Sequence, residues 1–174
     1  MIYDERAIRE AQALDIAQKM LVAARTAPKG KGVDVVECAV VDGDERETLV
    51  CAMEAIGKER DHQFFLRDAG CVRRSQCVVL VGTRAKMQGL NCGYCGFPTC
   101  GQKPAEAPCE INAVDVGIAL GSAVSRAQLY GVDTRIMFSA GTAAARLGLL
   151  GEEVGQVYAI PVSISSKSPF FDRS

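Results

Sequence analysis

The segment that most restricts how this chain can fold is residues 83–111, which holds four of its eight cysteines. It has neither the helical nor the strand repeat of apolar residues, and it contains three prolines, so no regular element is expected there. A loop longer than about 12–15 residues inside a compact domain usually has a function. The sequence therefore predicts a long functional loop, with a core built from the segments on either side of it.

The four cysteines of this loop follow the pattern C-x2-C-x4-C-x8-C, at Cys92, Cys95, Cys100 and Cys109. Thiolates are the usual ligands of iron–sulfur clusters, and four of them complete a [4Fe–4S] site. A glycine follows each of the first three cysteines, and glycines allow the positive φ that turns backbone N–H groups toward sulfur. The positive end of a following helix would favour a thiolate at Cys109. The pattern predicts a metal site and favours a [4Fe–4S] cluster.

Three alternatives remain open for the same cysteines. Structural zinc sites usually combine two close cysteine pairs, and this loop has a single C-x2-C. A redox-active thiol pair at Cys92 and Cys95, or four cysteines with unrelated roles, would also be consistent with this spacing. The remaining cysteines, at 38, 51, 71 and 77, are expected to pack as small apolar side chains.

Length, charge and the pattern of apolar residues indicate what kind of protein carries this loop. The length of 174 residues predicts one domain over 1–174. The net charge is −1 and no basic stripe appears, which argues against nucleic-acid binding. The N-terminus lacks the pattern of a secretory signal, and no apolar run is long enough to span a membrane. We expect a cytoplasmic protein, where clustered cysteines indicate metal rather than disulfides.

Apolar periodicity and turn residues outside the loop predict strands alternating with helices. Asn112 is the expected N-cap of the helix after the loop, and Pro161 is expected to place the last strand at a sheet edge. The fold class is thus α/β or α+β, in layers. The predicted helices are 3–24, 45–61, 63–74, 112–130 and 141–150, and the predicted strands are 33–42, 77–82, 134–139 and 157–164.

The stretch CGYCGFPTCGQKPAEAPCEINAVDVGIALGSAVSRAQ resembles an uncharacterised prokaryotic family of ferredoxin-domain-containing proteins. The resemblance continues through GVDTRIMFSAGTAAARLGLL and PVSISSKSPFFDR. The cysteine part is also similar to the four-cysteine iron–sulfur domain of acetyl-CoA decarbonylase subunits and electron-transport complexes, whose core is CGxCGxPxC. That domain has its fourth cysteine further downstream than Cys109 lies here. The resemblance implies a cluster bound by this loop.

Two other segments, AARTAPKGKG and DVGIALGSAVSRAQLYGVDTR, resemble parts of the flavin-dependent nitroreductase fold. The resemblance implies a nitroreductase-like central sheet flanked by helices, with the cysteine-rich loop inserted. It also implies that Arg25, Lys29 and Lys31 lie near an FMN phosphate. The small residues around Gly117 and Gly121 indicate close helix packing, within the chain or across a dimer. Because the nitroreductase-like fold is typically dimeric, the resemblance implies a homodimer. The Arg-Arg-Ser start of that fold's first helix is missing here.

These observations lead to two classes of function. The first is an iron–sulfur protein in electron transfer, or a flavin-linked oxidoreductase, served by a redox partner protein or a small-molecule electron donor. An electron carrier without a substrate pocket is a variant of it. The second is a non-enzymatic binding or sensing module stapled by zinc or a cluster. Whether the protein is an enzyme stays open at this point.

Overall fold

The computed structural model describes residues 1–171 and builds them on one four-stranded sheet. Most predicted elements are present, with shifted ends. The helices are α1 (Glu5–Thr26), α2 (Gly43–Glu59), α3 (Gln63–Arg73), α4 (Glu110–Gln128) and α5 (Phe138–Arg146), with short 3-10 turns η1 (Gly30–Gly32) and η2 (Cys100–Gln102). The strands are β1 (Val36–Val41), β2 (Cys77–Arg84), β3 (Asp133–Thr134) and β4 (Val154–Ser163). No helix within residues 1–171 is long and apolar enough to cross a membrane.

The sheet has the order β1-β2-β4-β3, and all neighbouring strands are antiparallel. Strand β2 occupies the centre and is buried from Cys77 to Thr83. The predicted strand 77–82 is confirmed, and its side chains are buried on both faces of the sheet. Alternate residues of β2 point to opposite faces, so the strand contributes to both halves of the core.

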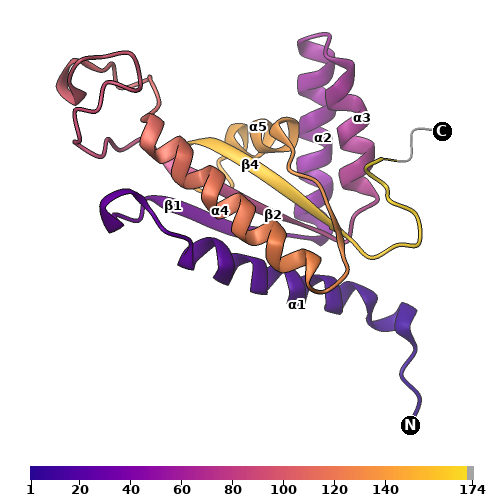
Figure 1. Cartoon of the computed structure of the whole chain (residues 1–174). Coiled ribbons are helices and arrows are strands. Elements are labelled where there is room, and N and C mark those ends of the chain that lie inside the picture. The colour runs from indigo at the N-terminus through magenta and orange to yellow at the C-terminus, as the bar shows by residue number, and fades with distance from the viewer. Residues whose placement is uncertain (172–174) are drawn as a thin grey trace.

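Helices cover both faces of the sheet, as Figure 1 shows. Helices α1 and α4 lie side by side on one face, where Val79 and Val81 of β2 join their apolar core. Helices α2, α3 and α5 cover the other face, where Val78 and Leu80 join a second core. The layered α+β fold class is therefore confirmed.

The α1–α4 contact depends on small side chains. Asp4 caps α1 by accepting a hydrogen bond from the Arg6 N–H. The inner faces of the two helices are lined mainly by fully buried alanines. Small side chains let two helices approach closely, and alanine has the highest helix propensity. These alanines are Ala13, Ala17, Ala24, Ala119, Ala123 and Ala127.

Two strand predictions near the C-terminus are wrong. Pro161 does not mark an edge, because β4 lies between β2 and β3. The predicted strand 134–139 is reduced to β3 and an isolated bridge between Met137 and Ala159. The β3–β4 register places Arg135 opposite Pro161, where a proline has no N–H to donate. The ladder is interrupted there, and the chain enters α5 at Phe138 instead of continuing as a strand.

The expected N-cap of α4 is also wrong. The helix begins at Glu110 with Cys109 as its N-cap residue, and Asn112 lies inside the first turn, 1% exposed. The end of the helix is close to the prediction, since Gly131 has the positive φ of +69° that a helix-terminating glycine adopts. The start moved because the side chain of Asn112 has partners in the loop rather than in its own helix.

Helix α5 packs directly on the backbone of β4. A Cβ placed on Gly141 would lie 2.0 Å from the Val157 carbonyl oxygen and 2.7 Å from the Tyr158 Cα. Only glycine permits this approach, so we expect Gly141→Ala to destabilise the fold by roughly 1–3 kcal/mol or more through overpacking. Urea denaturation followed by circular dichroism would measure the change.

The control is Gly70→Ala on α3, where the nearest atom to an added Cβ is the Arg74 Nη1 at 3.8 Å. Alanine in a helix interior with open space is expected to stabilise by about 0.5–1 kcal/mol. Equal effects of the two substitutions would contradict the close α5–β4 approach.

Candidate functional site

The cysteine loop runs from the end of β2 to the start of α4, and η2 is its only regular element. Figure 1 shows it projecting beyond the N-terminal end of α4, away from the helical layers. All four of its cysteines are free; Cys92 is exposed, and Cys95, Cys100 and Cys109 are half-buried. The predicted long loop is confirmed, and its thiols are within reach of solvent.

Local backbone geometry supports thiolate ligation. Gly93 and Gly96 have φ of +73° and +87°, and the Gly96 N–H closes a turn on the Gly93 carbonyl at 2.9 Å. The Asn91 N–H donates to the Cys100 Sγ at 3.4 Å, and the Asn91 Oδ1 accepts from the Cys100 N–H at 2.8 Å. Gly101 does not share the positive φ, because it lies within η2. The glycine prediction thus holds for two of its three positions.

The four thiols lie on one loop, but their sulfur atoms are not close enough together to bind one metal ion. Across residues 1–171, no three Cys, His, Asp or Glu side chains form a group that could hold a metal ion. The donor chemistry nevertheless fits a thiolate-bound cluster, because four free thiols share one loop and a backbone N–H already donates to one sulfur. Cys109 also lies at the N-terminus of α4 itself, whose dipole favours an anionic ligand. Ligation by all four requires the loop to contract.

The root of the loop is fixed by a polar network that sequence reasoning missed. The Asn112 Nδ2 donates to the Lys86 carbonyl, and the Asn112 Oδ1 accepts from the Gln88 Nε2 at 2.9 Å. The Lys31 Nζ donates to the Gln88 carbonyl at 3.0 Å. Both Gln88 and Asn112 are buried, so the loop begins on a rigid platform between β2, η1 and α4. The sequence signal was a polar Asn just after the last cysteine, which was interpreted as a cap.

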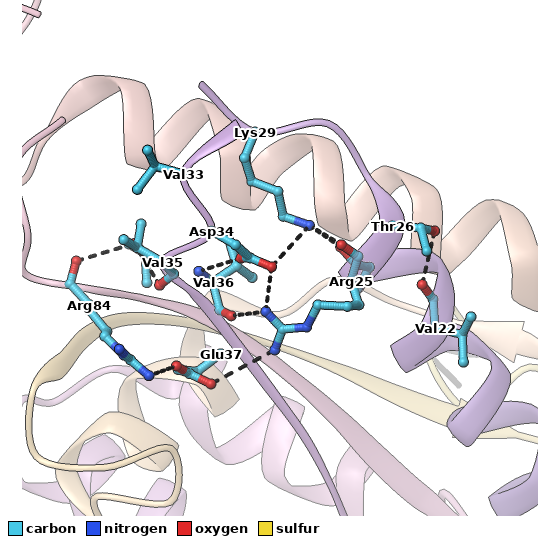
Figure 2. A network of polar contacts seen from close by, with 12 residues as sticks. Val22, Arg25, Thr26, Lys29, Val33, Asp34, Val35, Val36, Glu37 and Arg84 are labelled. Carbon is cyan, nitrogen blue, oxygen red and sulfur yellow. Dashed lines mark hydrogen bonds and ion pairs between the residues drawn. The ribbon is translucent and has the colours of Figure 1, made fainter. Parts of the chain in front are cut away.

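Figure 2 shows where two of the three predicted phosphate-binding cations lie. The Arg25 Nη1 donates to the Asp34 Oδ2 at 2.6 Å and to the Val36 carbonyl at 2.8 Å. The Lys29 Nζ donates to the Ala24 carbonyl at 2.9 Å, and its side chain is 5% exposed. Burial alone would raise the pKa of Asp34, but the Arg25 hydrogen bond lowers that pKa below its usual value. The side chains of Arg25 and Lys29 therefore stabilise the connection between the end of α1 and the start of β1.

The third cation, Lys31, belongs to η1, whose shape is set by α4. The Gly30 N–H donates to both carboxylate oxygens of Asp115, at 2.9 and 3.0 Å. A Cβ on Gly30 would lie 2.6 Å from the Ile111 Cγ2. Each of Arg25, Lys29 and Lys31 therefore already donates to a protein acceptor, although a lysine carries three N–H donors and an arginine five. Their placement near an FMN phosphate stays a prediction.

A cationic cavity that the sequence did not predict lies between α3 and residues 163–170. Its volume is about 970 Å³, and its lining includes Arg67, Arg74 and Lys167. The hydroxyls of Ser163 and Ser168 are buried there without a hydrogen-bond partner in the part of the chain that the structure describes. Arg74 donates to the Pro169 carbonyl at 3.1 Å and forms no ion pair with any residue of 1–171. This site offers positive charge and unused polar groups to an anionic ligand.

The other four cysteines mostly follow the packing prediction. Burial raises the pKa of Cys38 to about 11 and of Cys77 to about 12, so both thiols stay protonated at neutral pH. Burial also raises the pKa of Cys71, whose Sγ donates to the Pro169 carbonyl at 3.1 Å. Cys51 is a correction, because it lies on the exposed face of α2 rather than in the core.

Comparison with solved structures shows the class of fold. An FMN-dependent nitroreductase from Clostridium difficile R20291 superimposes with a TM-score of 0.58 and 15% identity, covering 88% of this chain and 76% of that one. A protein assigned as a nitroreductase, in complex with FMN, from Desulfovibrio desulfuricans gives a TM-score of 0.62 and 13% identity, covering 88% and 75%. The chain therefore has the nitroreductase fold, with the cysteine loop inserted between β2 and α4.

Sequence comparison then shows the family. A family model described as an uncharacterized protein containing a ferredoxin domain (DUF2148) matches residues 105–173, which include Cys109 but not the first three loop cysteines. An uncharacterized protein of Archaeoglobus fulgidus is 39% identical over 184 aligned positions, covering 100% of this chain and 98% of the relative. The chain belongs to this family of ferredoxin-domain-containing proteins, as the loop motif had indicated.

Proposed function

We propose that this protein carries electrons through a [4Fe–4S] cluster held by Cys92, Cys95, Cys100 and Cys109. The observation that carries the proposal is the set of four free thiols on one projecting loop, in a member of a ferredoxin-domain family. When bound, such a cluster supplies one-electron transfer at a potential tuned by hydrogen bonds to its sulfurs. The Asn91 N–H, which donates to the Cys100 Sγ at 3.4 Å, is one such donor.

The position of the loop suits exchange of electrons with a partner. Tyr94, between the first two cysteines, is 74% exposed, and Leu90 is 44% exposed. Exposed apolar side chains at a projecting site can pack against a redox protein, and the buried root holds the loop in place behind them. We propose that the partner docks on this tip, with a small-molecule electron donor as the alternative.

The first test is the iron and acid-labile sulfide content of protein purified without oxygen. We expect about four iron and four sulfide per chain, as four thiolates hold a cubane, and a large loss of both in Cys95→Ser and Cys109→Ser. Cys51→Ser is the matched control, because Cys51 is also free but lies on α2, and its iron content should equal the wild-type value.

One zinc per chain without sulfide would instead support the second class of function, a zinc-stapled binding or sensing module. Iron retained in Cys109→Ser but lost in Cys95→Ser would remove Cys109 from the ligand set. That outcome would leave a cluster with a different fourth ligand.

The second candidate function is a flavin-linked oxidoreductase, and the cationic cavity beside α3 favours it. Its volume of about 970 Å³ is at the upper end of the roughly 300–1,000 Å³ typical of cofactor pockets. Arg74 and the unpartnered Ser163 hydroxyl are suitable partners for a phosphate. Because the buried hydroxyls of Ser163 and Ser168 have no partner within residues 1–171, we propose this cavity ahead of the η1 loop as the place for an FMN phosphate.

Titration of free FMN, followed by quenching of its fluorescence, separates the two locations. We expect Arg74→Gln to weaken FMN binding by about tenfold or more, the effect of losing one charge-assisted hydrogen bond. Lys31→Gln, which removes an exposed cation of the η1 loop, should change the affinity less than twofold. If Lys31→Gln weakens FMN binding and Arg74→Gln does not, the η1 loop is the phosphate site. If FMN fluorescence is not quenched at all, the flavin proposal is wrong.

We also propose a homodimer formed through the outer face of α4. A Cβ added to Gly117 or Gly121 would have no atom within 4 Å, so these glycines do not serve helix packing within the chain. They are flanked by exposed Val114, Ile118 and Leu129, the last of them 73% exposed. An exposed apolar face with small residues at its centre is suited to a second copy of the same helix.

Light scattering coupled to size-exclusion chromatography tests this interface. We expect a dimer for the wild type and a monomer for Gly121→Leu, because the leucine would separate the two α4 helices. Ala55→Leu on the exposed face of α2 is the matched control and should remain dimeric. A monomeric wild-type protein would contradict the proposal.

A further inference from the structure

A second cavity lies at the root of the cysteine loop. It has a volume of about 450 Å³ and opens between the end of β2, loop residues 105–109, α5 and β4. This volume falls within the roughly 300–1,000 Å³ of small-molecule sites. Cys109 and Asn112 line it from the loop side, and Gln156 and Tyr158 line it from the sheet. We call it the loop-root cavity.

The walls of the loop-root cavity favour an apolar, flat ligand. Short aliphatic side chains, among them Pro108 and Ala145, form much of its surface. The rings of Phe138 and Tyr158 also line it. The Phe138 side chain is 56% exposed although it is large and apolar. Aromatic rings attract other rings in offset or edge-on contact, so the cavity suits a planar molecule.

The polar groups that line the cavity favour a ligand with a hydrogen-bond donor over a charged ligand. The Gln156 Oε1 is buried and accepts no hydrogen bond from residues 1–171. A buried acceptor without a donor is costly, and a ligand N–H or O–H would satisfy it. The two charged residues of the lining, Arg84 and Glu106, have opposite signs. Arg84 is further paired with Glu37 and with Glu153, the latter at 3.2 Å, so the cavity has no strong preference for either charge.

We propose that the loop-root cavity binds a neutral, planar aromatic or heteroaromatic molecule that donates an N–H or O–H to Gln156. The binding itself stands on the cavity alone. Its link to redox chemistry rests on the function proposed above, because Cys109 lines the same cavity and would bring a cluster ligand against the bound molecule. The site would then be where a small molecule meets the electron-transfer centre.

The probe for this site is 4-fluorobenzamide, followed by ¹⁹F NMR during titration of the full-length protein. Two close relatives test its chemistry: 4-fluorobenzoate carries a negative charge, and N,N-dimethyl-4-fluorobenzamide has no N–H to donate. We expect the benzamide to bind about tenfold more tightly than either relative, the effect of one hydrogen bond worth about 1.4 kcal/mol. Gln156→Leu should weaken the benzamide by the same factor and leave the dimethyl compound unchanged.

Two substitutions locate the binding. Gly155 lines the cavity and an added Cβ there meets no atom within 4 Å, so Gly155→Leu should fill the space and abolish the benzamide shift. Gly70→Leu, which occupies the cationic cavity beside α3, is the matched control and should bind the probe as the wild type does. Loss of binding in Gly70→Leu alone, equal or tighter binding of the benzoate, or no binding of the benzamide would each overturn the proposal.

Alkylation of the metal-free protein tests the contact with Cys109 without relying on a cluster. Saturating 4-fluorobenzamide should slow the iodoacetamide reaction of Cys109 several-fold, as measured by peptide mass spectrometry. The reaction of Cys92, which is exposed at the loop tip, should keep its rate. Equal rates at both cysteines with and without probe would show that the ligand does not reach Cys109. Since the readout needs no iron, its failure is distinct from failure of the cluster proposal.

Discussion

The antiparallel pairing of β2 with β4 is the interaction on which the rest of this structure depends. Strand β2 is buried from Cys77 to Thr83, and its alternate side chains supply both cores. Strand β4 pairs with β2 along its length. Helix α5 packs so closely on β4 that Gly141 has no room for a Cβ. The end of β2 is also where the cysteine loop begins. A rigid strand at that point means that the loop starts from a fixed direction, although most of it lies outside the core.

Polar groups at the start of α4 connect the basic η1 turn with the root of the cysteine loop. Asp115 of α4 holds Gly30 of η1, and Asn112 of the same helix holds Gln88 at the loop root. Lys31 closes the connection from η1 back to Gln88. The first two turns of α4 thus tie the basic turn and the cysteine loop to one element. Ligation at Cys109, the N-cap of α4, would act directly on that element, because a buried polar network responds as a unit.

The chain combines a nitroreductase fold with a loop that carries four cysteines. The nitroreductase fold is shown by structural neighbours that include FMN-containing proteins, and the family is one that contains a ferredoxin domain. The two cavities differ in the groups that line them. The one beside α3 offers cations and free hydroxyls to an anionic group, and the one at the loop root offers rings and an acceptor to a neutral molecule. Under the proposals made above, the FMN phosphate and the neutral aromatic molecule would bind at separate sites.

The sequence by itself determined the elements with strong local patterns. The α1 stripe, the apolar β2 run and the cysteine loop were all predictable, because periodicity and proline or glycine content act over a few residues. Tertiary structure decided what depends on distant partners. Pro161 is accommodated in a strand that lies between two others because the β3 ladder is interrupted beside it. Asn112 binds the loop instead of capping a helix, and Arg25 forms an ion pair with Asp34. Both cavities likewise join segments far apart in the chain, so no local pattern could reveal them.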